Sequence, residues 1–173
     1  MMFKSEKPHY TKLGIILEIF SISILLFFIV YTFLVWPSVP DKIPTHFGWS
    51  GQPNIWGAKG ILPTMIYVSV FIFILLSFVS RYPRTVKFPI GYEYDEDIAR
   101  LSLQLRFSLF LWIKAEIMLI SSYIGIQGIR VALEQSDGLG TYSAPIVMVT
   151  LFGTVAIFIY RAKKLKLPFW YGT

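Results

Sequence analysis

The residues best suited to chemistry lie in one polar segment, 36–60, which separates two long apolar runs. The segment holds four prolines, four glycines, three tryptophans and the histidine His46. An imidazole changes its charge near neutral pH, so it can serve as a base, a pH sensor or a metal ligand. Asp41 and Asn54 lie in the same segment and could act with it. The segment is therefore the first candidate for a functional site.

These side chains favour neither catalysis nor metal binding. Thr45 and Ser50 are close to His46, but their spacing matches no known arrangement of a nucleophile and a base. A metal site needs three or four ligands, the chain contains no cysteine, and the other histidine, His9, precedes the first apolar run. We therefore expect no enzyme activity, metal or cofactor. His46 is either a hydrogen-bonded residue that holds the segment in shape or a contact for a ligand.

A second group of reactive side chains falls inside apolar runs. Glu18, Lys114 and Glu116 lie where a centred ion costs about 2.5–3.5 kcal/mol, so each needs a partner or a function. Lys114 and Glu116 are two residues apart and point to opposite sides of a helix. The Glu116 face continues through Tyr123 and Gln127, which together could form a proton or cation relay.

The Lys114 face predicts contacts with another helix. It carries Ser121 and Gly125, a pair of small residues at the spacing that lets membrane helices approach closely. Glu18 and Lys114 lie at similar depths in their runs, so we predict that their charged ends meet. Alternatively, Lys114 extends toward the membrane surface and Glu18 reaches the headgroups. The span that carries Lys114 and Glu116 should be central in a bundle or line an interface between subunits.

The elements that position these residues are four apolar windows. The chain has 173 residues, of which 55% are apolar and only 15% charged, a composition typical of a membrane protein. A helix needs roughly 17–25 residues to cross a bilayer core. The predicted spans are about 13–35, 61–80, 107–126 and 144–160. We predict one all-α membrane domain over 1–173, with four transmembrane helices, a structured outer loop at 36–60 and a cytoplasmic loop at 81–106.

The distribution of Lys and Arg predicts the orientation, because positive charge is enriched on the cytoplasmic side. Most basic residues flank the two ends of the chain and the middle loop: Lys4, Lys7, Lys12, Arg81, Arg84, Lys87, Arg100, Arg106, Arg161, Lys163, Lys164 and Lys166. The opposite side has Lys42, Lys59 and Arg130. Both termini should be cytoplasmic and the 36–60 loop should face outward. The net charge of +6 is then a topology signal, and we do not expect nucleic-acid binding.

The outer loop should be stiff and close to the membrane. Pro37, Pro40 and Pro44 restrict the backbone before His46, so we expect a polyproline-like conformation there. Tryptophan side chains favour the headgroup region, which predicts that the loop folds down onto the helix ends. In the middle loop, an acidic cluster at 93–97 is typical of a helix N-terminus, and that helix should continue into the third span.

The loop also resembles a known motif. The strings VPDKIPTHF, GQPN and WGAK are similar to the signature of a bacterial membrane family of unknown function that forms the N-terminal part of SdpI-type immunity proteins. The matching positions are Pro40, Asp41, Ile43, Pro44, His46, Phe47, Gly51, Pro53 and Lys59. Asn54 stands where that family more often has Asp.

The resemblance implies a bacterial cell-membrane protein that gives immunity to, or senses, an extracellular membrane-active peptide. The implied partners are a peptide or lipid-like ligand and membrane lipids, and a homo-oligomer could form through the third span. The residues expected to bind the ligand are Pro40, Asp41, Pro44, His46, Phe47, Trp49, Gly51, Asn54, Trp56 and Lys59. Two alternatives stay open: a small proton- or ion-coupled transporter that uses Glu116, and an accessory subunit of a membrane complex.

Overall fold

Four helices make up most of the protein, as the apolar windows predict. The computed structural model describes residues 9–81 and 96–165, with only the backbone described at 96–99, so the acidic cluster at 93–97 lies outside the described side chains. The helices are α1 (Lys12–Val35), α2 (Ile61–Arg81), α3 (Glu96–Ala132) and α4 (Ser143–Lys164). All four are long and apolar enough to cross a membrane. The prediction of four membrane-spanning helices is confirmed.

The helices begin where local chemistry favours it. The Thr11 side chain accepts a hydrogen bond of 3.0 Å from the backbone N–H of Gly14 and caps α1. Pro63 and Pro145 lie in the first turns of α2 and α4, where a missing N–H leaves no helical bond unmade. Helix α3 is longer than the predicted span because it starts at Glu96, which confirms that a helix from the middle loop continues into the membrane.

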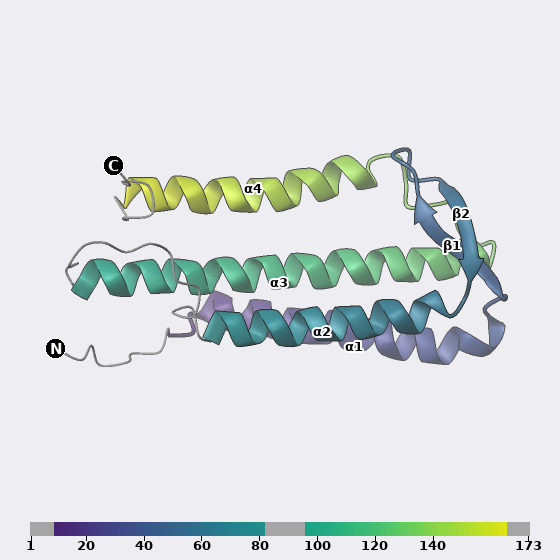
Figure 1. Cartoon of the computed structure of the whole chain (residues 1–173), viewed down its shortest axis with the longest axis horizontal. Helices are drawn as coiled ribbons and strands as arrows, with labels where there is room; N and C mark the ends of the chain where they lie inside the picture. Colours follow the sequence, from purple (N-terminus) through teal and green to yellow (C-terminus); the bar gives the residue numbers. More distant parts are fainter. Residues whose placement is uncertain (1–8, 82–95, 166–173) are drawn as a thin grey trace.

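Helix α3 is the centre of the bundle. It lies between α4 on one side and the pair α1 and α2 on the other (Figure 1), and it contacts all three. The first hydrophobic cluster joins α1 to α3 through Leu17, Phe107, Leu111 and Ala115. The prediction that the third span is central is therefore confirmed.

The loop between α1 and α2 is a β-hairpin, so the expected polyproline-like conformation is wrong. A short 3₁₀ turn (η1, Trp36–Ser38) leads into β1 (Lys42–Phe47), which pairs antiparallel with β2 (Pro53–Ala58). The backbone of 42–47 is extended, as the prolines predict, but cross-strand hydrogen bonds hold it in this conformation. The register shifts next to Pro44, where the ring removes a donor from the ladder.

The hairpin covers one end of the bundle. A second hydrophobic cluster lies beneath it and consists of Val39, Ile43, Leu62 and Ile129. These residues come from the hairpin region, α2 and α3, so burial of their side chains fixes the hairpin to the helix ends. This packing confirms that the loop folds down onto the helices.

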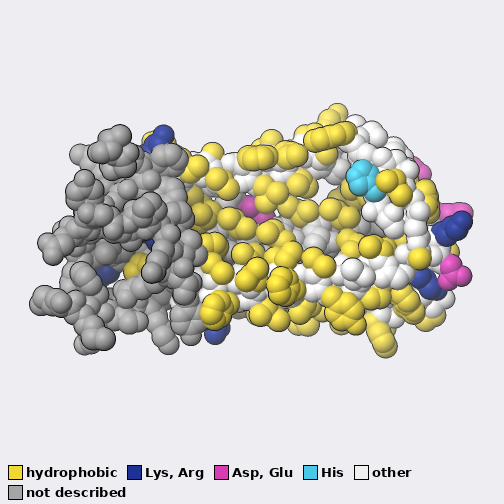
Figure 2. Space-filling model, in the orientation of Figure 1, with side chains coloured by type: hydrophobic (Ala, Val, Ile, Leu, Met, Phe, Trp, Pro, Cys, Tyr) yellow, Lys and Arg dark blue, Asp and Glu magenta, His cyan; other side chains and the backbone are white. Residues whose placement is uncertain are grey.

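The two ends of the molecule differ. Helix α1 begins and α4 finishes at one end, whereas the hairpin and the linker between α3 and α4 share the other (Figure 1). Apolar side chains cover the flank of the bundle, and charged side chains gather at the hairpin end (Figure 2). An apolar flank that gives way to a polar end is what a bilayer requires of a spanning bundle.

Candidate functional site

The base of the hairpin is closed by Lys59. Its ammonium lies 3.2 Å from an Asp41 carboxylate oxygen and donates a hydrogen bond of 3.1 Å to the carbonyl of Val39. The same nitrogen is 5.4 Å from the centre of the Trp36 ring, within the range of a cation–π contact. Lys59 is half-buried and Asp41 is exposed. Lys59 therefore joins the two ends of the hairpin, and Asp41 is its partner.

His46 and Asn54 face each other across the hairpin. The His46 Nδ1 atom lies 2.7 Å from the Asn54 side-chain oxygen, and both residues are exposed. In the tautomer that carries a proton on Nδ1, the ring donates to the Asn54 oxygen and Nε2 is left as an acceptor. His46 is thus hydrogen-bonded and accessible at once, so the two roles considered for it are compatible.

The tip of the hairpin is attached to the linker between α3 and α4 through glycines. The backbone N–H of Leu139 donates a hydrogen bond of 2.8 Å to the carbonyl of Gly51. Gly51 has φ +77°, and a Cβ there would overlap the Gly140 backbone, while one on Gly138 would overlap the Gly51 carbonyl. Only glycine allows these two backbones to come so close.

The structure divides the predicted ligand-binding residues by exposure. Pro44 and Gly51 are buried, and Phe47 and Lys59 are half-buried, so these four are less accessible to a ligand. The exposed members, which a ligand could meet directly, are Pro40, Asp41, His46, Trp49, Asn54 and Trp56.

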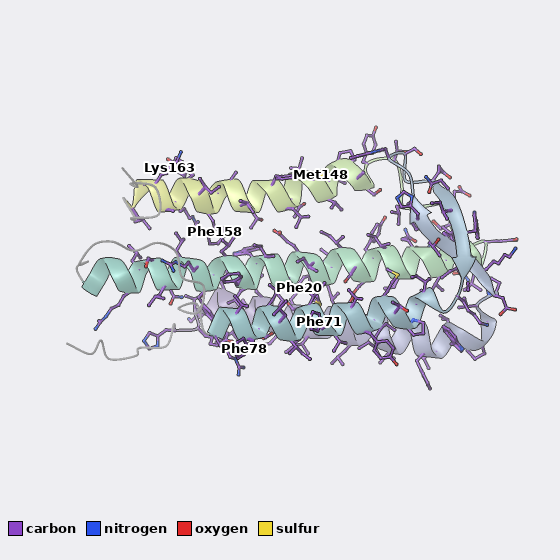
Figure 3. All side chains as sticks on the ribbon, viewed as in Figure 1. Phe20, Phe71, Phe78, Met148, Phe158 and Lys163 are labelled. Atoms are coloured by element: carbon purple, nitrogen blue, oxygen red, sulfur yellow. The ribbon has the colours of Figure 1, made fainter. Side chains whose placement is uncertain are left out.

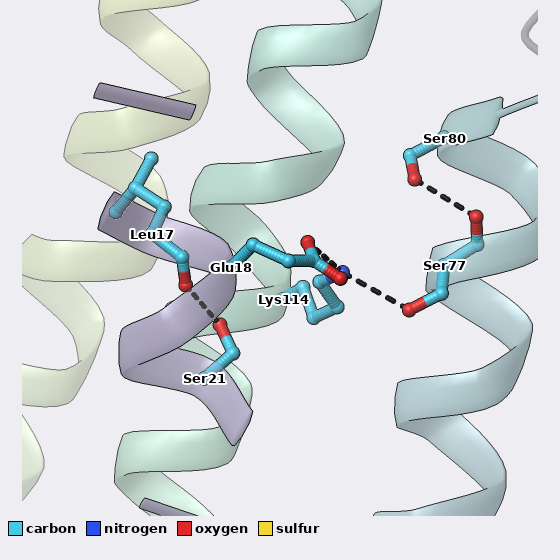
Figure 4. Close-up of polar contacts among 6 residues, drawn as sticks. All are labelled: Leu17, Glu18, Ser21, Ser77, Ser80 and Lys114. Atoms are coloured by element: carbon cyan, nitrogen blue, oxygen red, sulfur yellow. Dashed lines mark hydrogen bonds and ion pairs between the residues drawn. The ribbon is translucent and has the colours of Figure 1, made fainter. Parts of the chain in front are cut away.

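The Lys114 face of α3 is a closed polar contact (Figure 4). The Lys114 ammonium lies 2.5 Å from a Glu18 carboxylate oxygen and donates a hydrogen bond of 3.0 Å to the Ser77 hydroxyl. It is also 4.8 Å from the centre of the Phe73 ring. The predicted meeting of Glu18 and Lys114 is confirmed. The alternative, in which Lys114 extends to the surface, is wrong because its side chain is only 1% exposed.

The same face is tightly packed further along. Phe28 of α1 is fully buried, and its ring lies directly over Gly125 of α3, so that an added Cβ would overlap it. Met118 is fully buried on this face as well. The small residue at Gly125 therefore does what its spacing predicts: it lets another helix approach.

The Glu116 face is different. Glu116 is 7% exposed, and one of its oxygens accepts a short hydrogen bond from the Thr154 hydroxyl of α4. Its other oxygen, Oε2, is buried and has no hydrogen-bond partner among the described residues. A buried carboxylate oxygen without a partner is costly in an apolar environment.

The relay considered for this face is not continuous. The Tyr123 hydroxyl donates to the carbonyl of Leu139 at 2.6 Å, and the Gln127 amide nitrogen lies 3.4 Å from the Tyr123 oxygen. Tyr123 and Gln127 are thus brought together, but Glu116 bonds to Thr154 and not to either of them.

A pocket of about 400 Å³ lies between α3 and α4. Its lining comes from α3, α4 and the linker that joins them: Glu116, Leu119, Ile120, Tyr123, Leu139, Gly140, Thr141, Tyr142, Ser143, Ile146, Val147 and Thr150. Figure 2 shows one acidic surface within the apolar flank, between α4 and the rest of the bundle. This volume falls in the range of natural small-molecule sites.

The pocket exists because only part of α4 packs closely against α3. The buried residue of α4 is Phe158, which points toward α3 (Figure 3), whereas Lys163 points away. Phe158 and Thr154 thus hold the second half of α4 against α3. The pocket lies beside the first half, which follows directly from the linker.

Sequence reasoning missed several of these residues. Thr150 and Thr154 are four residues apart in an apolar helix, which is a signal for a polar stripe that meets another helix. Gly138 and Gly140 lie in a glycine-rich turn, but nothing local indicates that the hairpin tip docks there. Ser77 lies among apolar residues, and its role as a partner of Lys114 depends on a contact between helices distant in sequence.

The fold and the site define a helical membrane protein with four potential spans and a hairpin that caps one end. The family described as Domain of unknown function (DUF1648) matches residues 23–70, a segment that includes the second half of α1, the hairpin and the start of α2. An uncharacterized protein of Archaeoglobus fulgidus is 28% identical over 71 residues, which cover 36% of this chain and 39% of that protein. No solved structure matches the chain.

Proposed function

We propose that the protein recognises a membrane-active peptide through its hairpin and acts in immunity or sensing. The observation that carries this proposal is the exposure of large apolar side chains on the hairpin. Trp49 is 77% exposed and Trp56 is 50% exposed, and Ile55, which precedes Trp56 in β2, is exposed as well. Large exposed apolar side chains on a polar cap are typical of a surface that binds a partner.

The rigidity of the hairpin supports this role. Lys59 closes its base, the cluster around Ile43 packs the start of β1 against the helix ends, and Gly51 fixes its tip to the linker. Indole rings on a fixed backbone supply contact area with little loss of conformational entropy on binding. His46 and Asp41 add polar groups that could orient a peptide.

The distribution of charge supports the proposed orientation. Described basic residues at the end opposite the hairpin include Lys12, Arg81, Arg161 and Lys164, which flank three of the four helices. By the positive-inside rule, that end would be cytoplasmic and the hairpin would face outward. In this orientation, a bacterial cell would present the hairpin to peptides that arrive from outside.

The test is protection of cells from added peptide. Bacteria that express the protein are challenged with membrane-active peptides, and Trp49→Ala, Trp56→Ala, His46→Ala and Asp41→Ala variants are compared with the parent. Because interface tryptophans commonly contribute about 2 kcal/mol or more, losing either one should reduce protection at least tenfold.

The matched control is Phe33→Ala, since Phe33 is as exposed as Trp49 but lies on α1. It should keep full protection, and all variants should reach parental abundance in the membrane. Full protection by the four hairpin variants at parental abundance would exclude recognition through the hairpin.

A second candidate function is transport through the Glu116 face. The buried oxygen without a partner favours it, because such a group can take up and release a proton or a cation during transport. If the protein is a transporter, Glu116→Gln should abolish proton or cation flux in proteoliposomes, whereas the hairpin variants should change this flux only weakly. The two functions are thus distinguished by which set of variants inactivates the protein.

A further inference from the structure

We propose that the pocket between α3 and α4 binds a lipophilic amine, an apolar body with one ammonium group that pairs with Glu116. This proposal goes beyond recognition at the hairpin and does not depend on it. The site is formed by the flank of the bundle and not by its exposed cap.

The lining favours an apolar ligand. Leu119, Ile120, Ile146 and Val147 form the walls that α3 and α4 provide. The pocket volume of about 400 Å³ can hold a small apolar body, and contact with these walls replaces contact with lipid or water.

The position of Glu116 specifies a cationic group. Along α3, Glu116 is the pocket residue farthest from the linker, and Thr150 lines the pocket from α4. Glu116 is more than nine-tenths buried and lines the pocket, and its Oε2 atom has no hydrogen-bond partner among the described residues. The cation nearest in sequence, Lys114, is already paired with Glu18.

An ammonium group would supply what Glu116 lacks. A buried carboxylate avoids the cost of an uncompensated charge by taking up a proton or by pairing with a cation. Oε2 itself is covered, so a rotation of the Glu116 side chain would present it to the three N–H donors of an amine in the pocket. The attraction is then strong because the surroundings are apolar. A neutral alcohol or a carboxylate of equal length would gain much less or be repelled.

The linker connects the wall of the pocket to the hairpin tip. Leu139 and Gly140 line the pocket, and the same two residues contact Gly51 at the hairpin tip. The Tyr123 hydroxyl of α3 also holds the linker, because it donates a hydrogen bond to the carbonyl of Leu139. The wall of the pocket nearest the hairpin is therefore held from two sides.

Protection from alkylation tests the proposal in the intact protein. The chain contains no cysteine, so Val147→Cys introduces a single thiol into the pocket wall and Val149→Cys introduces one on the exposed side of α4. Each variant in lipid nanodiscs is treated with a membrane-permeant maleimide, with decylamine or decanol added.

Decylamine should slow alkylation of the Val147→Cys variant several-fold but leave the Val149→Cys variant unchanged. Adding Glu116→Gln should weaken this protection about tenfold or more, because a bond to a charged partner is lost. Glu134→Gln, the same chemical change at an exposed residue outside the lining, should leave it intact.

Three results would overturn the proposal. Equal protection by decanol would mean that the pocket accepts any apolar chain, such as that of a lipid. Unchanged protection in the Glu116→Gln background would show that the carboxylate makes no contact, and no protection by decylamine at all would show that the pocket does not bind amines. The comparison of decylamine with decanol uses the native carboxylate, so it remains decisive even if Glu116→Gln fails to fold.

Discussion

The two faces of α3 differ although the residues that define them are neighbours. Lys114 has a carboxylate, a hydroxyl and an aromatic ring around its charge, supplied by α1 and α2. Glu116 has one hydroxyl from α4, one oxygen without a partner and a pocket beside it. The same helix thus presents a buried charge with three partners on one side and a carboxylate with one unpartnered oxygen beside a pocket on the other. We call the Lys114 side the closed face and the Glu116 side the open face.

This difference distinguishes a face that stabilises the fold from a face that can bind a ligand. Buried charges inside a membrane need compensation, and where side chains of the protein provide all of it, the contact stabilises the fold. Where compensation is incomplete and space remains, a ligand can complete it. The Lys114 face accordingly contributes to stability, and the Glu116 face is the one for which we propose binding.

The largest expected effect comes from breaking the closed face. Lys114→Met leaves Glu18 without its cation, and removing one partner of a buried pair costs about 3–5 kcal/mol of unfolding free energy. Thermal unfolding of the purified protein in detergent measures the loss. Lys164→Met, at an exposed position on the last turn of α4, should change stability little.

Adding Glu18→Gln to Lys114→Met should restore part of the stability, because it removes the unpaired charge. If Lys114→Met unfolds at the parental temperature, the Lys114 face does not stabilise the bundle.

The next largest effect comes from the packing of the same face. Gly125→Ala forces a Cβ into the ring of Phe28, which is fully buried and cannot swing aside. Overpacking of this kind costs roughly 1–3 kcal/mol of unfolding free energy. Gly153→Ala in α4 is the matched control, since its Cβ meets no neighbour and helix propensity favours alanine there.

Phe28→Leu should partly rescue Gly125→Ala by making room for the new methyl group. Equal stability of Gly125→Ala and Gly153→Ala would show that α1 and α3 do not meet as closely as described.

A smaller effect on stability is expected where the hairpin tip contacts the linker that lines the pocket. Gly51→Ala puts a non-glycine residue in a left-handed backbone conformation, which costs about 1–2 kcal/mol of conformational free energy. The new Cβ would also overlap the Gly140 backbone. The hairpin tip should separate from the linker without unfolding the helices. Hydrogen exchange at Leu139, whose N–H bonds to Gly51, should therefore become faster.

Gly60→Ala provides the control, because its Cβ would meet no neighbouring atom. Unchanged exchange at Leu139 in Gly51→Ala would contradict the attachment of the hairpin tip to the linker.

The sequence predicts the closed face much better than the open one. Glu18 and Lys114 could be paired from their depths alone, because helices in a membrane keep a fixed rise per residue. Gly125 could be placed at a helix contact from the spacing of small residues. Ser77 could not be predicted, since many hydroxyls in spans bond only to their own helix, as Ser21 does to the carbonyl of Leu17.

The open face depends on contacts that no local pattern encodes. Glu116 stands out in the sequence as a charge within an apolar span, but its partner Thr154 lies on another helix, and the pocket exists because α4 packs closely only in part. The prolines predict an extended, polyproline-like backbone before His46, but the strand pairing that replaces it requires 42–47 and 53–58 to face each other. Docking of Gly51 on the linker joins segments far apart in the chain.

The most direct test of the difference between the two faces is the unfolding temperature of Glu18→Gln and Glu116→Gln, measured side by side. Glu18→Gln removes a charge that Lys114 needs, so it should lower stability by about 1–3 kcal/mol, whereas Glu116→Gln removes an incompletely paired charge and should leave stability unchanged or raise it. An equal loss in both variants would show that Glu116 is as fully compensated as Glu18 and that α3 has no open face.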